Sequence, residues 1–146
     1  MRVALGCDHG GFQLKPTVLE ALADAGCDVV DCGTYSADSV DYPDYAALVA
    51  QKVVSQEAEL GIVICGTGIG ISIAANKIKG IRAALCSDTY SARMSREHNN
   101  ANVLALGARV IGPGLAYDIV KAFLSGSFAG GRHAVRVDKI TALEEE

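Results

Sequence analysis

Short apolar runs alternate with longer amphipathic stretches along the whole chain. The apolar runs predict five strands, at residues 2–7, 28–32, 60–65, 81–86 and 103–106. Between and after the runs, apolar residues recur at helical spacing. They predict helices at residues 12–25, 45–56, 89–97, 114–124 and 134–143, and a short helix that ends near residue 77. This alternation implies a parallel sheet with helices on both faces and right-handed crossovers. The predicted fold class is therefore α/β, in three layers.

The ends of the predicted strands are the places where chemistry is expected. In parallel α/β sheets, ligands bind beyond the carboxyl ends of the strands, near the point where the strand order reverses. The candidate segments are residues 7–9, 65–70, 87–88 and 107–109. His98 lies in the segment before the last strand, and we expect it on this same side of the sheet.

Size and composition describe one globular domain that spans residues 1–146. Half of the residues are hydrophobic and 21% are charged, which excludes a disordered chain. No linker, low-complexity segment or repeat divides the chain. The 13 basic and 17 acidic residues leave a net charge of −4, and aromatic residues make up only 5%. These values argue against nucleic acid or an anionic membrane as a partner.

Two absences from the sequence favour the cytoplasm as the compartment. No apolar stretch approaches the length of a transmembrane helix, and the first apolar run is too short for a signal peptide. The five cysteines are odd in number and contain no CxxC pair, which argues against a disulfide framework or a zinc ribbon. No cofactor and no metal are expected. Buried packing is the default interpretation of Cys7, Cys27, Cys32 and Cys86.

The loop Cys65-Gly66-Thr67-Gly68-Ile69-Gly70 carries the most information about chemistry. A dinucleotide-binding fingerprint and a Cys-x5-Arg phosphatase loop both fail, because residue 71 is Ile rather than Gly or Arg. Backbone N–H groups at a glycine-rich helix start could instead stabilise a developing oxyanion, with Cys65 as base or nucleophile. The structural alternative is a buried small residue followed by a turn.

Other candidates are ambiguous when each is taken alone. His9 and His98 suit proton transfer, but a lone histidine often has only a structural hydrogen bond. Arg132 and Arg136 lie four residues apart on one helix face and suit a phosphate group, although a solvated face is the usual meaning of such a pair. Arg109 would add a third cation at the strand ends.

Taken together, these residues resemble a known family. The chain contains, in order, Asp8-His9-Gly10-Gly11, Asp41-Tyr42-Pro43, Gly66-Thr67-Gly68-Ile69-Gly70, Ala74-Ala75-Asn76-Lys77, Arg96-Glu97-His98-Asn99-Asn100-Ala101, and Arg132-His133 with Arg136. The combination resembles the type B ribose-5-phosphate isomerases, within the sugar-phosphate isomerases that also act on allose 6-phosphate and galactose 6-phosphate. The resemblance covers residues 2 to about 140.

The resemblance implies a Rossmann-like α/β/α sandwich and a homodimer, often paired into tetramers, whose active sites are shared between subunits. It implies interconversion of ribose 5-phosphate and ribulose 5-phosphate, a step of the pentose phosphate pathway, through a cis-enediolate and without a metal. The C-terminal helix, at about residues 134–143, would pack on or reach the partner.

The resemblance also implies a role for each site residue. Cys65 resembles the base that moves a proton between C2 and C1; some members instead use a Glu at the position of Ile71, so this chain falls in the branch with a cysteine base. His98 resembles the acid/base that opens the sugar ring, with Asp8 and Thr67 nearby. The remaining roles are an anion hole, a hydroxyl ligand and a phosphate site. They fall respectively on Thr67 with the backbone of Gly66, Gly68, Ile69 and Gly70, on Asn99, and on His9, Arg109, Arg132 and Arg136.

Two alternatives stay open at this point. The same chemistry could act on a six-carbon sugar 6-phosphate, because the sequence does not measure the room between Cys65 and the arginines. A non-catalytic module that binds sugar phosphates or nucleotides would lack the base or the ring-opening histidine, and both residue types are present here.

Overall fold

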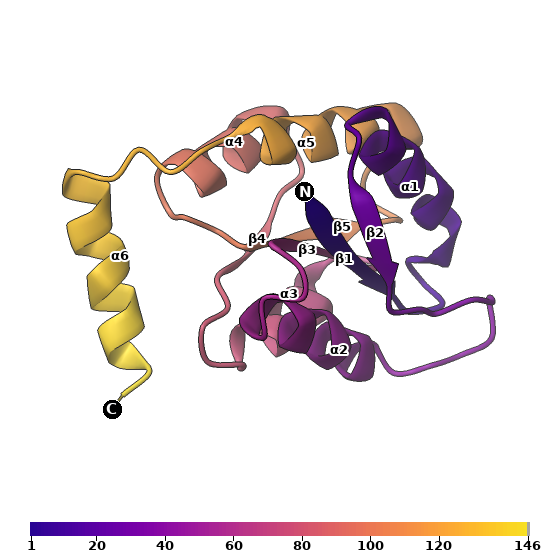
Figure 1. Ribbon diagram of the computed structural model, residues 1–146. Helices are drawn as coiled ribbons and strands as arrows, with labels where there is room; N and C mark the ends of the chain where they lie inside the picture. Colours follow the sequence, from indigo (N-terminus) through magenta and orange to yellow (C-terminus); the bar gives the residue numbers. More distant parts are fainter. Residues whose placement is uncertain (146) are drawn as a thin grey trace.

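The computed structural model describes residues 1–145, in which strands and helices alternate as the hydrophobic pattern predicts (Figure 1). The strands are β1 (Arg2–Cys7), β2 (Asp28–Asp31), β3 (Leu60–Cys65), β4 (Ala83–Leu85) and β5 (Val103–Gly107). The helices are the short 3-10 turn η1 (Phe12–Leu14), α1 (Lys15–Asp24), α2 (Tyr42–Val54), α3 (Ile69–Asn76), α4 (Thr89–Glu97), α5 (Pro113–Ser125) and α6 (Arg132–Leu143).

All five strands form one parallel sheet in the order β2-β1-β3-β5-β4. The chain moves from β1 outward to β2 and then crosses to the other side of β1 for β3, so the strand order reverses between β1 and β3. Every residue of β3 is buried, because both faces of this central strand are covered. The reversal point is where a ligand site is expected in this topology.

Helices cover both faces of the sheet, which confirms the predicted Rossmann-like three-layer fold. Alternate strand residues such as Leu5, Ile62 and Leu104 pack against α1, α4 and α5. Their neighbours, such as Val63 and Ala105, pack against α2 and α3. This period of two follows from the pleat of a strand. In Figure 1 the two helical layers lie above and below the sheet.

Several element boundaries differ from the predicted ones by one to three residues, with the clearest differences in α2, β4 and α6. Helix α2 begins at Tyr42 rather than at residue 45, because Pro43 occupies the first turn, where a missing N–H costs nothing. Strand β4 has three residues rather than six, and it lies at the edge of the sheet. Helix α6 begins at Arg132 rather than at residue 134.

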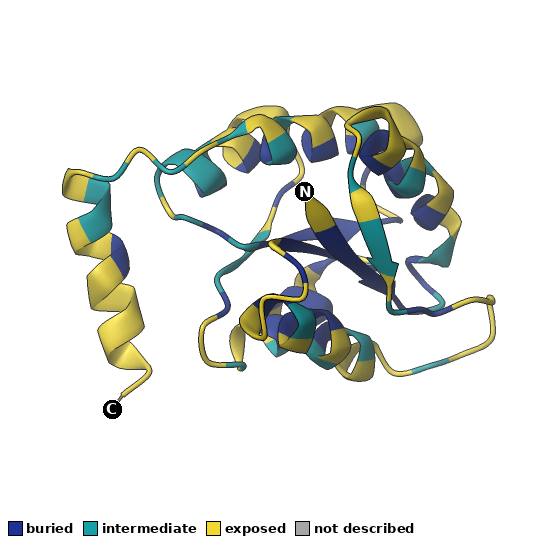
Figure 2. Cartoon of the chain, viewed as in Figure 1, coloured by how far each residue is buried: buried dark blue, intermediate teal, exposed yellow. Residues whose placement is uncertain are grey.

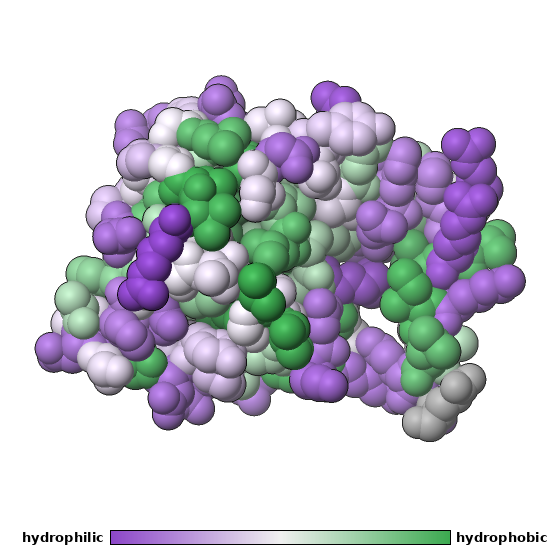
Figure 3. All heavy atoms as spheres, turned by 180° about the vertical axis from the view of Figure 1, so that it is seen from behind, coloured by the Kyte–Doolittle hydropathy of each residue, from purple (hydrophilic) through white to green (hydrophobic). Residues whose placement is uncertain are grey.

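Helix α6 stands away from the rest of the chain (Figures 1 and 2). Its first turn contacts α4 through His133 and His98, and Glu144 accepts a hydrogen bond from the N–H of Gly80 at 3.0 Å. Between these attachments Figure 3 shows a hollow, lined partly by Ile140 and Leu143. Several apolar side chains of α6 are exposed, among them Val135 at 58% and Leu143 at 64%. No helix among residues 1–145 is both long and apolar enough to cross a membrane.

Candidate active site

The loop after β3 is shaped by a residue that must be glycine. Gly68 has a φ of 78°, a left-handed conformation that only glycine adopts readily. A Cβ atom there would lie 2.5 Å from Cδ1 of Leu85, so the space is closed as well. This turn directs the N–H of Gly68 to the sulfur of Cys65, where it donates a hydrogen bond at 3.1 Å. Cys65 itself is 5% exposed, at the carboxyl end of the central strand.

The start of α3 supplies further N–H donors beside Cys65. The Thr67 hydroxyl accepts a hydrogen bond from the N–H of Ile69 at 3.1 Å, which leaves the N–H groups of Gly70 and Ile71 as first-turn donors without an intrahelical acceptor. Such groups favour an anion, helped by the helix dipole. The ring of Tyr42 lies directly over Gly70, where a Cβ would be 2.6 Å from the ring carbon Cζ.

The loop after β1 lies beside the loop after β3. The N–H of Asp8 donates to the carbonyl of Ile64 at 3.2 Å, which ties the two strand ends together. The buried Asp8 carboxylate accepts the N–H of Gly11 at 2.9 Å, so one of its oxygens closes its own turn. Nδ1 of His9 accepts the N–H of Val40 at 3.2 Å, so the proton of the neutral ring is on Nε2.

Arg109 joins this group from the end of β5. Its N–H donates to the carbonyl of Gly66 at 2.9 Å. Its guanidinium lies against Gly66, where a Cβ atom would be 3.1 Å from Nη1. The structure thus brings Asp8, His9, the loop of residues 65–70 and Arg109 together at the carboxyl edge of the sheet.

The expectation that His98 lies on this side of the sheet is wrong. His98 is the C-cap of α4, which returns the chain to the amino edge before β5 begins. The register pairs Gly61 with Val103 and Cys65 with Gly107, so the two edges are separated by four steps of about 3.3 Å, or about 13 Å. Within one chain, His98 and the adjacent Asn99 cannot reach Cys65.

The two arginines of α6 accompany His98 at the amino edge. His133, between them in sequence, stacks on His98 with ring centroids 4.1 Å apart and an angle of 9° between the planes. Burial lowers the pKa of His133, and the neighbouring His98, Arg132 and Arg136 lower it further. Arg132 and Arg136 are exposed, so both guanidinium groups are free to meet a ligand.

Burial makes three of the other four thiols harder to ionise. Burial raises the pKa of the Cys86 thiol to about 11, and it also raises the pKa values of Cys7 and Cys32. All five cysteines are free. Among residues 1–145, no three His, Cys, Asp or Glu side chains are grouped so that they could hold a metal ion.

Two side chains of these groups have no role assigned to them from the sequence. Tyr42 lies over Gly70, whereas the Asp41-Tyr42-Pro43 segment by itself favours a turn over a border of the pocket. His133 stacks on His98, and its position between two arginines was the one available signal.

Comparison with known proteins identifies the family. The sequence profile of the Ribose/Galactose Isomerase family matches residues 3–140. The chain belongs to this family. It is 54% identical over 144 residues to "Ribose-5-phosphate isomerase B" of Escherichia coli, with 99% of this chain and 97% of that protein covered. The predicted resemblance is therefore confirmed.

Solved structures of the ribose/galactose isomerase family have the same fold. The Clostridium thermocellum ribose-5-phosphate isomerase B superposes with a TM-score of 0.97 at 56% identity, covering 99% of this chain and 98% of that one. The Trypanosoma brucei type B ribose 5-phosphate isomerase gives a TM-score of 0.95 at 48% identity, covering 97% of each chain.

Proposed function

We propose that the protein interconverts ribose 5-phosphate and ribulose 5-phosphate in the cytoplasm, through a cis-enediolate. The observation that carries the proposal is the buried Cys65 sulfur, which accepts the N–H of Gly68 beside the first-turn N–H groups of α3. The names of the relatives from Escherichia coli and Clostridium thermocellum support the choice of substrate. The five free thiols support a reducing compartment.

In the proposed isomerisation, the thiolate of Cys65 removes the proton from C2 of the open-chain aldose. The C2–H electrons form a C1–C2 double bond, and the carbonyl oxygen on C1 becomes an oxyanion. The N–H groups at the start of α3, with Thr67 and the backbone of residues 66–70, stabilise this oxyanion. Cys65 returns the proton to C1 while the hydroxyl proton on O2 passes to O1, which completes the ketose. One base thus serves both carbons.

Ring opening precedes this step, because most of a pentose phosphate is cyclic. We assign it to His98, which takes the proton from the hydroxyl on C1 and delivers one to the ring oxygen. Asn99 binds a substrate hydroxyl. The phosphate group is bound by His9 and Arg109 of the carboxyl edge and by Arg132 and Arg136 of the amino edge. This binding energy positions the reacting carbons.

These roles require a homodimer, in which the amino edge of one copy meets the carboxyl edge of the other. The 13 Å separation within one chain supports this arrangement. So do the exposed apolar side chains of α6, since a helix that reaches a partner would bury them. Two such dimers pair into a tetramer in our proposal, as the resemblance implies.

The test is turnover of ribose 5-phosphate, allose 6-phosphate and galactose 6-phosphate by wild type and by Cys65→Ala. We expect ribose 5-phosphate to be converted fastest, and we expect Cys65→Ala to lower kcat by about a thousandfold, the usual size of a lost general base. Cys27→Ala, at a thiol beside the start of the outer strand β2 and on the opposite side of the sheet from β4 and β5, should leave kcat unchanged. Faster turnover of a hexose 6-phosphate would change the substrate, and wild-type turnover by Cys65→Ala would remove Cys65 from the mechanism.

A further inference from the structure

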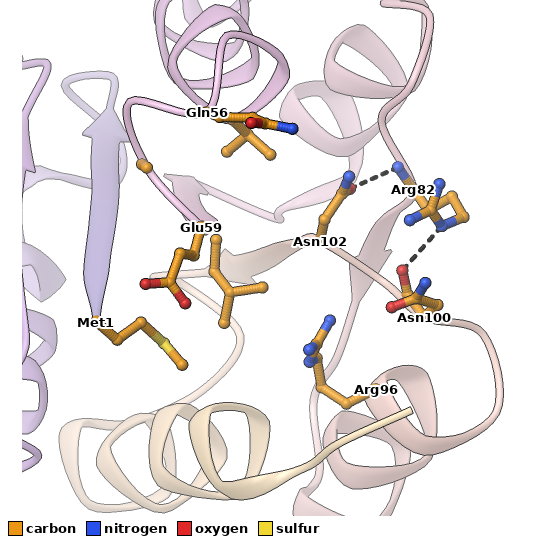
Figure 4. A pocket seen from close by; sticks show the side chains of 10 residues that line it. Met1, Gln56, Glu59, Arg82, Arg96, Asn100 and Asn102 are labelled. Carbon is orange, nitrogen blue, oxygen red and sulfur yellow. Dashed lines mark hydrogen bonds between the residues drawn. The ribbon is translucent and has the colours of Figure 1, made fainter. Parts of the chain in front are cut away.

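A pocket lies at the amino edge of the sheet, on the far side from Cys65 of the same chain. It has a volume of about 560 Å³ and opens where β1, β3 and β5 begin (Figure 4). Its charged and polar lining residues are Gln56, Glu59, Arg82, Arg96, Asn100 and Asn102. In Figure 4, Arg82 and Arg96 lie on one side of the pocket, and Glu59 lies on the other with Met1.

Arg82 and Arg96 are engaged only by neutral groups. Nε of Arg82 donates to the carbonyl of Asn100 at 2.8 Å, and Nη1 of Arg96 donates to the carbonyl of Ala101. Neither guanidinium has a carboxylate at ion-pair distance in the part of the chain that the structure describes. Nε of Arg96 is buried and has no hydrogen-bond partner there.

Two half-buried cations beside each other are unfavourable without an anion. Burial lowers the pKa of Arg96, and the charge of Arg82 lowers it further. Burial also lowers the pKa of Arg82, an effect that Glu144 partly opposes. The Glu144 carboxylate, however, accepts its hydrogen bond from the N–H of Gly80 and forms no ion pair with Arg82 or Arg96. A buried polar atom without a partner in a native fold calls for an explanation, and a bound ion is one.

We propose that this pocket is a second anion site, in which Arg82 and Arg96 together bind a small phosphorylated or carboxylated molecule. Guanidinium groups suit such ligands because their planar N–H forks match two oxygen atoms at once. The pocket volume lies within the range of small-molecule sites. Glu59 lies on the opposite wall, and its carboxylate repels any negative charge that reaches across the pocket. The ligand therefore carries its negative charge in one small group, next to the arginines.

The site is also joined to the loop that carries His98 and Asn99. The two arginines bind the carbonyls of Asn100 and Ala101, directly after those residues. A ligand bound in the pocket would therefore contact side chains that hold the segment of His98 and Asn99, to which the proposed reaction assigns a role. The existence of the site does not depend on that role.

The experiment is a titration of the full-length protein with inorganic phosphate, followed by the backbone amide signals in NMR spectra. The amides of residues 80–82 and 100–102 report the new pocket, while those of residues 66–70 report the proposed substrate site. We expect saturable shifts in both groups, with different dissociation constants. Saturable shifts at residues 66–70 alone would overturn the proposal, whether the pocket is empty or filled by a carboxylate of a second copy.

Two pairs of variants test the charges. Glu59→Gln removes the carboxylate that faces the pocket and should tighten phosphate binding there severalfold, without any loss of fold. Glu57→Gln changes the net charge equally but lies outside the pocket lining, so it should leave the affinity unchanged. Arg82→Met should weaken binding by at least about tenfold, the value of a charged hydrogen bond, whereas the exposed Arg93→Met should not. Equal affinities within the Glu59 and Glu57 pair would contradict the proposal.

Discussion

The two edges of the sheet present different chemical groups. At the carboxyl edge the groups proposed to act on the reacting carbons are backbone N–H groups and one sulfur, held by a glycine turn that closes against Leu85, with His9 and Arg109 beside them. At the amino edge they are imidazole and guanidinium side chains on α4 and α6, and much of α6 is exposed. The first edge is rigid and suited to a developing oxyanion, and the second is cationic and suited to a phosphate group.

Under the roles proposed above, this difference gives each chain two half-sites rather than one complete site. In a parallel sheet every connecting helix must run back to the amino edge, so residues after a strand and residues after a helix lie on opposite sides. Cys65 follows a strand and His98 follows a helix. Self-association of two copies is the simplest way to bring opposite edges together, because a two-fold axis then completes both sites at once.

The largest effect is expected when each chain carries one defect, on the carboxyl edge in one variant and on the amino edge in the other. Cys65→Ala and His98→Asn homodimers should each have little activity. Unfolding and refolding them together at equal amounts should restore about a quarter of wild-type turnover, because half of the dimers are mixed and each has one intact site of two. The measurement is turnover of ribose 5-phosphate per total chain.

A matched mixture provides the control for this experiment. Cys65→Ala refolded with Thr67→Val carries both defects on the carboxyl edge, so no mixed dimer would contain an intact site and activity should stay low. Recovery in this control, or none in the first mixture, would mean that the site is not divided between the edges as proposed.

A smaller effect tests the rigidity of the carboxyl edge. Gly68→Ala places a methyl group in a left-handed conformation and against Leu85, so we expect the free energy of unfolding to fall by roughly 2–4 kcal/mol. Gly114→Ala, in the first turn of α5 with open space around it, should change the free energy of unfolding by less than about 0.5 kcal/mol. Urea denaturation at one fixed protein concentration measures both. Equal stabilities of the Gly68→Ala and Gly114→Ala variants would mean that the loop shifts to accommodate the methyl group.

The fold and the carboxyl edge could be predicted from the sequence because their signals are local. The buried run that ends at Cys65 marks a central strand, and the glycines that follow it mark a tight turn into a helix. The residues after β1 and β5 reach the same edge simply because the strands are parallel. No long-range contact has to be known for this result.

The amino edge could not be placed in the same way. The motif around His98 marks a functional segment, but its side of the sheet follows from the direction of α4, which places it opposite Cys65. The overlap of Tyr42 with Gly70 joins segments nearly thirty residues apart, and the pairing of His133 with His98 depends on the path of α6. Such contacts come from tertiary packing rather than from periodicity.

The smallest effect concerns the stack of His133 on His98. His133→Ala should lower kcat for cyclic ribose 5-phosphate by about two- to tenfold, the value of an aromatic pair, while His133→Phe should retain most of this kcat.

The pKa of the wild-type His133 is lowered from 6.5 by burial and by His98, Arg132 and Arg136, so the folded protein binds fewer protons there than the unfolded chain. The stack is therefore stable above pH 6.5 and weakens as the pH falls through that value and then through the lowered pKa. Activity of wild type should fall more steeply below pH 6.5 than that of His133→Phe, which takes up no proton at this position. Identical acid limbs for the two proteins, or equal losses in the Ala and Phe variants, would show that stacking does not hold His98 in place.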